Sequence, residues 1–446
     1  MKKLLLLLFL FPQSGLTQSA ILQQYIQQGI EGNLALKQQN LEIEKAFKAI
    51  EEARSNLFPK VAFAPTYTLA AGGRKIDFPI GDLLNPVYGT LNQLTASNSF
   101  PEIQNEQIQF LPNNFQETKV NFQLPLFNSD IKYNIELKKE MVKTESAKKK
   151  LLTYELKYQI EAAYYQYLQS LEAVKIYEQS SSFLHDYLVF NQRLVDNDVA
   201  LKDVVYSAEY ELSKLEAEIA VAKKNVNVAK AYFNFLINRE SYAPVEDDPA
   251  IFTQKPLLSE LDYYQNEALK NRPEFDQLQA GQEVTNTLLE MQEKSAVLPS
   301  LFVGGNVGFQ GFGYTFKNQG YALGQFGLNW DLYHGKEKKI KIQQTRIQQH
   351  ILDTKEEEAV SQIKLQVARA YYEIQGALQK MESVNKGIKS TDQLLQLVEK
   401  KYKNNNALYI EVIKAQNDRK LAQLSASISA YELWLKKAEL EKASGL

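Results

Sequence analysis

The sequence predicts a mostly helical protein with a small β part, built as a tandem duplication. Three observations lead to this fold class: similar segments recur far apart, two long blocks contain no proline, and four short runs alternate apolar with polar residues. Helices and strands have different side-chain periods, so each kind of run predicts its own element. We therefore expect two halves, each with a helix, a pair of strands and a very long helical hairpin.

The duplication is visible as similar segments at a constant separation. Residues 159–165 resemble residues 366–372, which follow 207 positions later, and Ala200-Leu201 recurs as Ala407-Leu408 at the same separation. Internal repetition of this kind indicates a fold made of two similar units. The boundaries that we expect are 18–252 for the first structural repeat and 253–446 for the second.

The first 17 residues have the pattern of a secretory signal. Two lysines precede an apolar run over residues 4–11, and the small residues Gly15 and Thr17 follow it. A membrane-spanning helix needs ~20 apolar residues, so this run is too short to serve as one. We expect cleavage after residue 17 and export of the remaining chain.

Two blocks without proline predict the helical hairpins. No proline occurs between Pro125 and Pro244, or anywhere after Pro299. Proline breaks helices, so its absence over such distances indicates long uninterrupted helices. At ~1.5 Å per residue, the longest of these helices would measure roughly 100 Å.

The turns of the two hairpins are marked by short polar clusters. The first hairpin is expected over residues 128–238, with its turn at 195–199, and the second over residues 337–443, with its turn at 404–406. Helices of this length exceed a compact domain, so we expect them to pack side by side as in coiled coils.

Four runs of alternating residues predict strands, and their period of two suits a lipid-facing strand or a half-buried strand of a soluble sheet equally well. The secretory signal and the helix lengths favour lipid, because no remaining globular segment offers the strands a core. The runs lie at about residues 60–70, 118–127, 300–312 and 322–333.

Four strands do not close a membrane barrel, which needs ~8. An open edge in lipid leaves backbone groups without hydrogen bonds, at a cost of several kcal/mol each. Other copies of the chain must therefore complete the strands. Two copies give eight strands and a filled interior, whereas three copies give twelve strands and a lumen.

Composition excludes several functional classes. The formal charge of −2, from 51 basic and 53 acidic residues, argues against a nucleic-acid partner. The absence of cysteine excludes disulfides and thiol chemistry. His185, His334 and His350 are too few and too scattered to predict a metal site. No set of side chains has the spacing of a catalytic triad, so we expect neither an enzyme nor a cofactor.

Several short motifs lie in the same order and spacing as in one known family, and the chain resembles the TolC-type outer-membrane efflux proteins over essentially its whole mature length. Each motif is weak alone, but together they are specific. They are NLAL at 33–36, residues 53–59, LPLFN at 124–128, AAYY at 162–165, NRPE at 271–274 and RAYY at 369–372.

The resemblance implies a homotrimer in the outer membrane of a Gram-negative bacterium. Its twelve-stranded barrel would lie in outer-membrane lipid, and its α-helical barrel would form a tunnel through the periplasm. The implied function is that of an exit duct for a tripartite efflux pump or a type I secretion system. The implied partners are a periplasmic adaptor protein and an inner-membrane pump.

The resemblance also points to an entrance at the hairpin tips. Glu411 stands where the family often has a gating acid, and Lys414 stands where a second acid is common. Asp203 is the corresponding acid of the first repeat. Both acids also suit the start of a helix, whose dipole favours negative charge. The residues expected to contact an adaptor are Asp196, Asn197, Asp198, Asn404, Asn405 and Asn406.

Two other functional classes stay open, and one segment is unassigned. A periplasmic adaptor also uses a helical hairpin, but it has only one, between soluble β-domains. A surface receptor or adhesin scaffold would use the long loop at residues 76–114 for binding, with transport incidental. This loop is much longer than its counterpart at 313–321. Its role is not predicted by the sequence.

Overall fold

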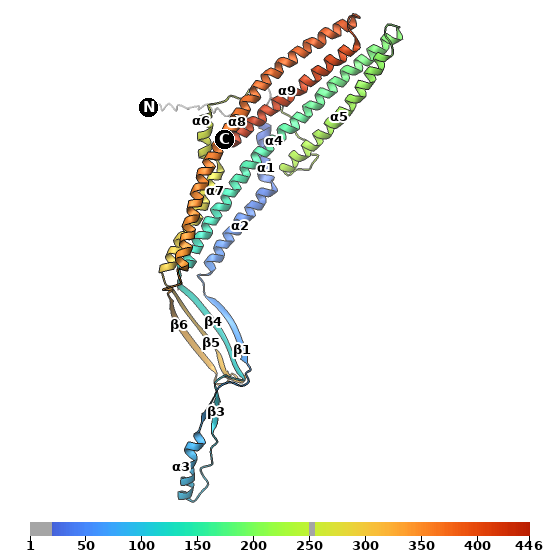
Figure 1. The fold of residues 1–446 in the computed structure, drawn as a ribbon. Coiled ribbons are helices and arrows are strands. Elements are labelled where there is room, and N and C mark those ends of the chain that lie inside the picture. Colours follow the sequence, from blue (N-terminus) through green and yellow to red (C-terminus); the bar gives the residue numbers. More distant parts are fainter. Residues whose placement is uncertain (1–19, 249–254) are drawn as a thin grey trace, which may run out of the picture. The chain divides into compact units, whose positions relative to one another are not determined.

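The computed structural model describes residues 20–248 and 255–446, so the predicted signal at 1–17 lies outside the described residues. The chain forms two compact units (Figure 1). One holds the residues up to Phe47, Glu140–Thr285 and Ile347–Leu446, and the other holds Lys48–Lys139 and Asn286–Arg346. Each unit takes segments from both halves of the sequence, so the two units do not correspond to the two predicted repeats. That division into repeats stays a prediction.

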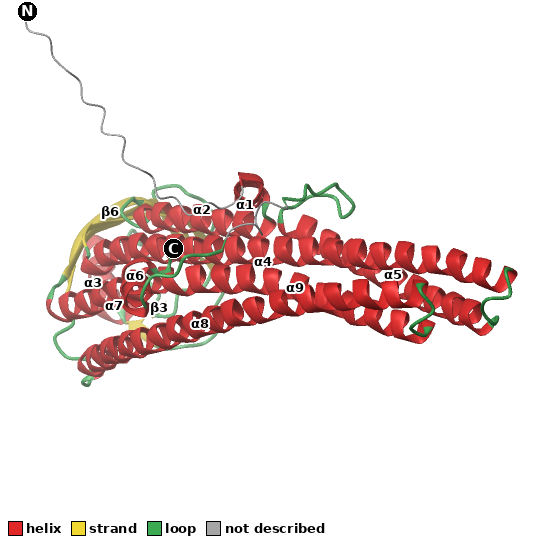
Figure 2. Cartoon of the chain, turned by 90° about the horizontal axis from the view of Figure 1, so that it is seen from above, coloured by secondary structure: helices red, strands yellow, loops and turns green. Residues whose placement is uncertain are grey.

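The predicted mostly helical character is confirmed. In both Figure 1 and Figure 2, the parts of α4, α5, α8 and α9 near the hairpin turns run side by side. No helix in the described part of the chain combines the length and the apolarity that crossing a membrane requires. The main helices are α1 (Ala20–Gly32), α2 (Leu34–Ser55), α4 (Ser129–Asp196), α5 (Asp203–Leu236), α6 (Leu261–Asn271), α7 (Pro273–Val297), α8 (Glu337–Lys403) and α9 (Tyr409–Ser444).

One apolar core joins α1 to the long helices of the first hairpin. Tyr164 on α4 and Phe233 on α5 are fully buried, and their rings lie 5.5 Å apart. Tyr25 of α1 packs edge-on against Phe233, at 5.1 Å between ring centroids. Gly29 lets α1 approach α4 closely, because a Cβ at this position would lie 2.3 Å from Ile160. A methyl group there would have to displace the end of the Ile160 side chain.

A second apolar core joins α6 to the second hairpin. Ala268 of α6 packs with Val367 and Ile374 of α8 and with Leu433 and Leu440 of α9. These five side chains are almost completely buried. Burial of this kind contributes ~25 cal/mol per Å² of apolar surface, so it supplies most of the stability of a long helix.

Four of the strands form one antiparallel sheet in the order β1-β4-β5-β6, and the pairing of β4 with β5 joins the two halves of the sequence. Paired residues face the same side, so Phe63, Val120 and Val307 lie on one apolar face. The four strands are β1 (Lys60–Thr68), β4 (Phe115–Phe127), β5 (Ser300–Phe312) and β6 (Gly320–Asn329).

The last strand ends earlier than the alternation suggested. The pattern extended to residue 333, but β6 ends at Asn329. Trp330 instead turns its indole N–H to the carbonyl oxygen of Val297, at 3.1 Å. β6 ends at Asn329 because its partner β5 begins only at Ser300, which pairs with Asn329. The alternation within one segment does not show where its partner strand begins.

The segment at 76–114, which we expected to be a loop, has regular structure. It contains a two-stranded sheet of β2 (Lys75–Phe78) and β3 (Glu106–Gln109), and helix α3 (Ile80–Thr95). The expectation of a loop was wrong because Pro86 and Gly89 argue against a helix by propensity. The apolar spacing of Leu83, Val87 and Leu94 was the available signal for it.

Candidate functional site

The two hairpin turns close with the same backbone geometry. After α4, the backbone N–H of Val199 donates to the carbonyl oxygen of Leu194 at 2.8 Å. After α8, the backbone N–H of Asn406 donates in the same way to the carbonyl oxygen of Lys401, also at 2.8 Å. In each turn one residue has a left-handed backbone, Asp198 with φ 56° and Asn405 with φ 58°. This is a Schellman-type helix end, and Asp and Asn accept its conformation better than most residues.

The predicted adaptor-contacting residues therefore have a structural role as well as an exposed position. All six, at 196–198 and 404–406, are exposed. The Asn197 side chain donates to the carbonyl oxygen of Arg193 at 2.7 Å and so satisfies the end of α4. We expect replacements in these turns to alter the helix ends and not only the surface.

Sequence reasoning missed the apolar side chains at the same turns. Leu201 and Leu408 are 79% and 68% exposed, and Val199 and Ile410 are exposed beside them. The signal was present, because Ala200-Leu201 recurs as Ala407-Leu408. The tips thus present leucines together with carboxylates and amides.

Glu411 has a defined contact in the structure. It is the third residue of α9, and its carboxylate accepts a hydrogen bond from the backbone N–H of Leu408 at 3.0 Å. This contact satisfies one of the free N–H groups at the helix start. Lys414 is exposed, and in the described part of the chain no ion pair joins it to Glu411. The carboxylate therefore caps α9 in the single copy.

Asp203 does not match Glu411 in position. It is the first residue of α5, whereas Glu411 is the third of α9. At the separation of 207 residues that relates the two turns, Val204 corresponds to Glu411. When the two turns are aligned, Asp203 therefore lies about one residue before the position that corresponds to Glu411.

A tyrosine cluster lies below the tips and links the two hairpins. We use this name for Tyr187 of α4, Tyr402 of α8 and Tyr409 of α9, whose rings lie 5.7 to 6.2 Å apart. The Tyr402 hydroxyl donates to Oδ1 of the fully buried Asn191 at 2.7 Å. Burial raises the pKa of all three hydroxyls above the ordinary value. All three hydroxyls therefore stay protonated at neutral pH.

Replacing Tyr402 with phenylalanine should loosen this link. Asn191 would lose its hydroxyl donor in a site without solvent, which costs about 1–3 kcal/mol. We expect faster amide hydrogen exchange at the ends of α4 and α8, measured by mass spectrometry on the purified protein. Tyr242→Phe is the matched control, because Tyr242 is 76% exposed. Equal exchange in both variants would show that the hydroxyl contributes nothing to holding the hairpins together.

The NRPE motif forms a buried polar site at the end of α9. Arg272 is 6% exposed. Its guanidinium makes two hydrogen bonds to the carboxylate of Glu274, at 2.5 and 2.9 Å. It also donates to the carbonyl oxygens of Lys442 and Ala443 at 3.1 and 3.2 Å. Sequence reasoning quoted this motif without assigning it a role. Its role is to cap the last turn of α9, where free carbonyls attract a cation.

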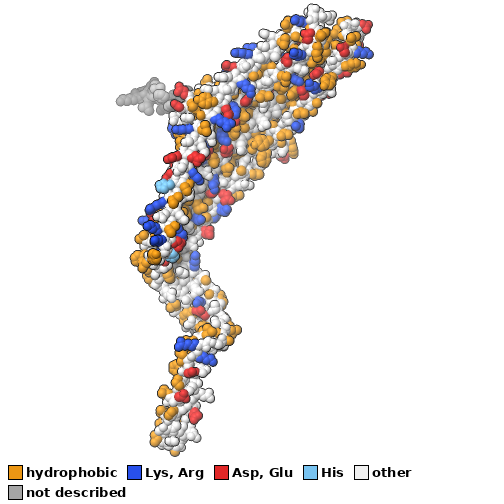
Figure 3. Space-filling model, viewed as in Figure 1, with side chains coloured by type: hydrophobic (Ala, Val, Ile, Leu, Met, Phe, Trp, Pro, Cys, Tyr) orange, Lys and Arg blue, Asp and Glu red, His pale blue; other side chains and the backbone are white. Residues whose placement is uncertain are grey.

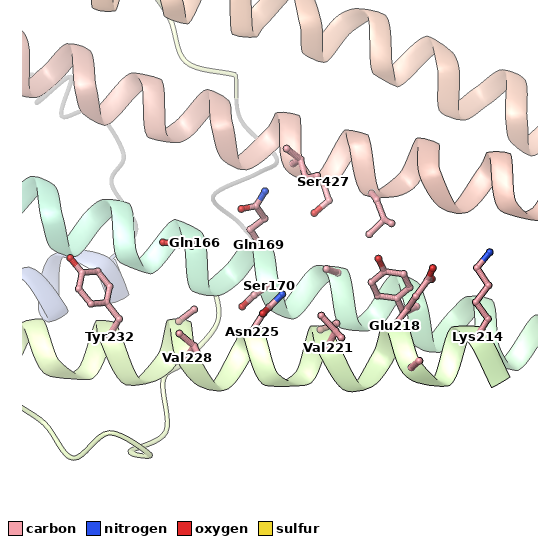
Figure 4. A pocket seen from close by; sticks show the side chains of 17 residues that line it. Gln166, Gln169, Ser170, Lys214, Glu218, Val221, Asn225, Val228, Tyr232 and Ser427 are labelled. Carbon is pink, nitrogen blue, oxygen red and sulfur yellow. The ribbon is translucent and has the colours of Figure 1, made fainter. Parts of the chain in front are cut away.

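A groove of about 1030 Å³ lies along α4, between α5 and α9. Figure 4 shows Gln166, Gln169 and Ser170 on α4, Tyr232 and other side chains along α5, and Ser427 on α9. Apart from these polar groups the lining is mostly aliphatic. Its acid, Glu218, is paired with Lys420 at 2.8 Å. Such a surface suits passive contact and has no paired acid and base for proton transfer.

Within the ranges 20–248 and 255–446, no group of three or more His, Cys, Asp or Glu side chains is placed to hold a metal ion.

Comparisons with known proteins agree with the predicted resemblance. Residues 265–446 match the family described as outer membrane efflux protein. A comparison with curated proteins found no match. The family resemblance that the motifs predicted is thus confirmed by the match over residues 265–446.

Solved structures share the fold over nearly the whole chain. The open state of the MtrE outer membrane channel from Neisseria gonorrhoeae is 17% identical, with a TM-score of 0.69, covering 95% of this chain and 89% of that one. The outer membrane protein VceC from Vibrio cholerae is 12% identical, with a TM-score of 0.67, covering 95% and 96%. The CmeC outer membrane channel from Campylobacter jejuni is 12% identical, with a TM-score of 0.68, covering 96% and 86%.

Proposed function

We propose that this chain, whose residues 265–446 match the outer membrane efflux protein family, is the exit duct of a tripartite efflux pump or a type I secretion system. The observation that carries the proposal is the family match, in a chain that shares the fold of solved outer-membrane channels over 95% of its length. Nothing in the match supports the alternative of a receptor or adhesin scaffold. A duct acts by its shape and charge and needs no catalytic residue.

The four-stranded sheet would be the membrane part in the outer membrane. One of its faces exposes large apolar side chains, among them Val61, Phe63 and Phe326, which are 68–69% exposed. β1 and β6 are its outer strands, so each has one edge that no other strand of the sheet covers. Lipid tolerates the apolar face but not the open edges. Three copies would pair these edges into twelve strands, enough for a lumen.

The helices also support association of copies. An exposed apolar stripe on α5 and another on α8 each fall within about a quarter of the helix circumference at 3.6 residues per turn. Large apolar surfaces on soluble helices mark contact with other chains. We call them the α5 stripe (Tyr206, Tyr210, Val221, Val228, Tyr232 and Phe235) and the α8 stripe (Ile347, Ile351, Leu365, Tyr372, Leu394 and Leu397).

In the proposed trimer the hairpin tips would form the periplasmic entrance. Three copies of Glu411 would stand around one axis, and Asp203 would add a second set of acids. The exposed leucines and amides of the tips would then contact a periplasmic adaptor, which joins the duct to the inner-membrane pump. A narrow opening with several carboxylates concentrates a negative potential and favours cations.

Charge changes at the entrance should alter ion selectivity. Glu411→Gln should reduce the preference for cations in planar-bilayer conductance, while its amide oxygen can still cap α9. Lys414→Glu should raise the preference and make multivalent cations better blockers. Both effects should shrink at about 1 M salt, where screening acts within ~3 Å. If both variants kept the ion selectivity of the wild-type protein, Glu411 would serve only to cap α9.

Deletion of the gene tests the proposed function directly. We expect the deletion strain to become sensitive to toxic small molecules or to lose secretion of an exported protein, with restoration by the wild-type chain. The localisation is checked separately by membrane fractionation, which should place the protein in the outer membrane. Unchanged efflux and secretion across a broad panel would contradict the duct, whatever the localisation.

A further inference from the structure

Helix α3 is held in place by asparagine side chains that bind the returning chain. Asn85 both donates to the carbonyl oxygen of Ile103 at 2.9 Å and accepts from its N–H at 2.8 Å. One face of α3 is therefore fixed to this chain. Seven residues on, Asn92 makes the same two contacts with Phe100, at 2.8 and 3.1 Å.

The opposite face of α3 has no partner in the described part of the chain. Leu83, Val87 and Leu94 are 73%, 51% and 79% exposed. We call these three residues the α3 stripe. With Ile80 and Thr90 they follow the alternating spacing of three and four residues by which one helix packs along another. Both ends of α3 are anchored, so the stripe is presented as a rigid surface.

The surroundings of the stripe carry one sign of charge. Residues 76–114 contain four carboxylates and no lysine, arginine or histidine. Within the described ranges, the side chains of Asp77 and Asp82 accept hydrogen bonds only from neutral amides, those of Gln107 and Asn105, at 2.7 and 2.9 Å. Among the described residues, no salt bridge compensates any of the four. On the face drawn in Figure 3, the end of this segment shows orange and red side chains, with blue ones only where it begins.

We propose that the α3 stripe is a docking surface for a cationic amphipathic helix of another polypeptide. The leucines and the valine would bury the apolar face of that helix, and the four carboxylates would attract its lysines and arginines. Because the carboxylates surround the stripe and do not line it, they would act mainly by steering the partner. This interaction is additional to the duct and does not depend on transport.

Charge argues for this occupant over two others. A second copy would bring four more carboxylates to the same surface, and like charges repel. An anionic lipid surface would be repelled in the same way, and helices that lie on such surfaces carry lysine and arginine on their polar face. α3 carries none.

Two synthetic peptides test the proposal. Both match α3 in length, 16 residues, and have leucines at helix-packing positions; one has lysines at its polar positions and the other glutamates. Binding is measured by fluorescence anisotropy on the mature protein in nanodiscs of uncharged lipid. We expect the lysine peptide to bind and the glutamate peptide not to bind. Binding should weaken with added salt, because exposed charges are screened.

Three variants separate the contributions. The triple variant Leu83→Ser, Val87→Ser and Leu94→Ser should weaken binding of the lysine peptide at least about tenfold. Leu257→Ser, at a leucine that is 90% exposed and lies outside this segment, should not. The pair Glu102→Gln and Glu106→Gln should reduce both the affinity and its salt dependence. All of these side chains are exposed, so the fold should persist.

Three results would overturn the proposal. The first is equal binding of both peptides, and the second is undiminished binding to the triple variant. The third is that, without any peptide, the triple variant forms a smaller assembly than the wild-type protein. This result would show that a second copy of the chain occupies the α3 stripe. Because the readout is peptide binding to purified protein, it stays informative even if the deletion strain shows no transport defect.

Discussion

Replacing Arg272 with alanine is expected to lower the free energy of unfolding by an amount near the lower end of the ~3–5 kcal/mol that breaking a buried ion pair from one side costs, because the Glu274 side chain is 30% exposed. The change would leave the half-buried carboxylate of Glu274 without its partner. It would also uncap the carbonyls of Lys442 and Ala443 at the end of α9. The midpoint of chemical or thermal unfolding, followed by helical circular dichroism in detergent, measures the loss.

Two further variants show whether geometry or charge accounts for this loss. Arg272→Lys keeps the charge but loses the planar fork that binds both carboxylate oxygens, so we expect an intermediate loss. Arg346→Ala is the matched control: its pair with Glu293, at 2.8 Å, is solvent-exposed, and exposed pairs contribute about 0–1 kcal/mol. If Arg272→Ala were no more harmful than Arg346→Ala, the site would not stabilise α9.

Placing a carboxylate in the α5 stripe or the α8 stripe is expected to abolish assembly and with it transport. Val228→Asp and Leu365→Asp each put a charge where the proposed trimer buries apolar side chains that are 62% and 70% exposed in one copy. Burying an unpaired charge costs several kcal/mol. Every 1.4 kcal/mol lowers the association constant about tenfold. Crosslinking and native mass measurement in detergent should show monomers.

The control for this experiment lies next to the stripe. Asn227 is exposed beside Val228 but points away from the α5 stripe, so Asn227→Asp adds the same charge without disturbing association. Normal assembly with Val228→Asp and with Leu365→Asp would exclude both stripes from the contact between copies. Loss of assembly with Asn227→Asp as well would indicate a general effect of charge on α5.

Elements that depend on neighbouring residues were predictable from the sequence. The absence of proline predicted the long helices, and α8 runs over residues 337–403 as expected. Alternation identified strands near their observed places. Helix and strand formation depend on local propensity and on apolar period, and both can be read from a single segment.

The errors occurred where local signals conflicted. Pro86 and Gly89 hid α3, although the spacing of Leu83, Val87 and Leu94 indicated it. The contacts of Asn85 and Asn92 with the returning chain outweigh these two unfavourable residues. Such compensation is invisible in the sequence, because the residues that supply it, Ile103 and Phe100, carry no helical signal of their own.

The sequence by itself determined the helical class, the repeated segments, the approximate elements and the family resemblance. Only the tertiary structure decided which distant residues meet: Arg272 with the end of α9, Asn191 with Tyr402, and β4 with β5. It also decided which apolar faces lack a partner in one copy. The physical reason is that periodicity identifies the apolar face of an element, whereas the partner of that face depends on how the whole chain packs.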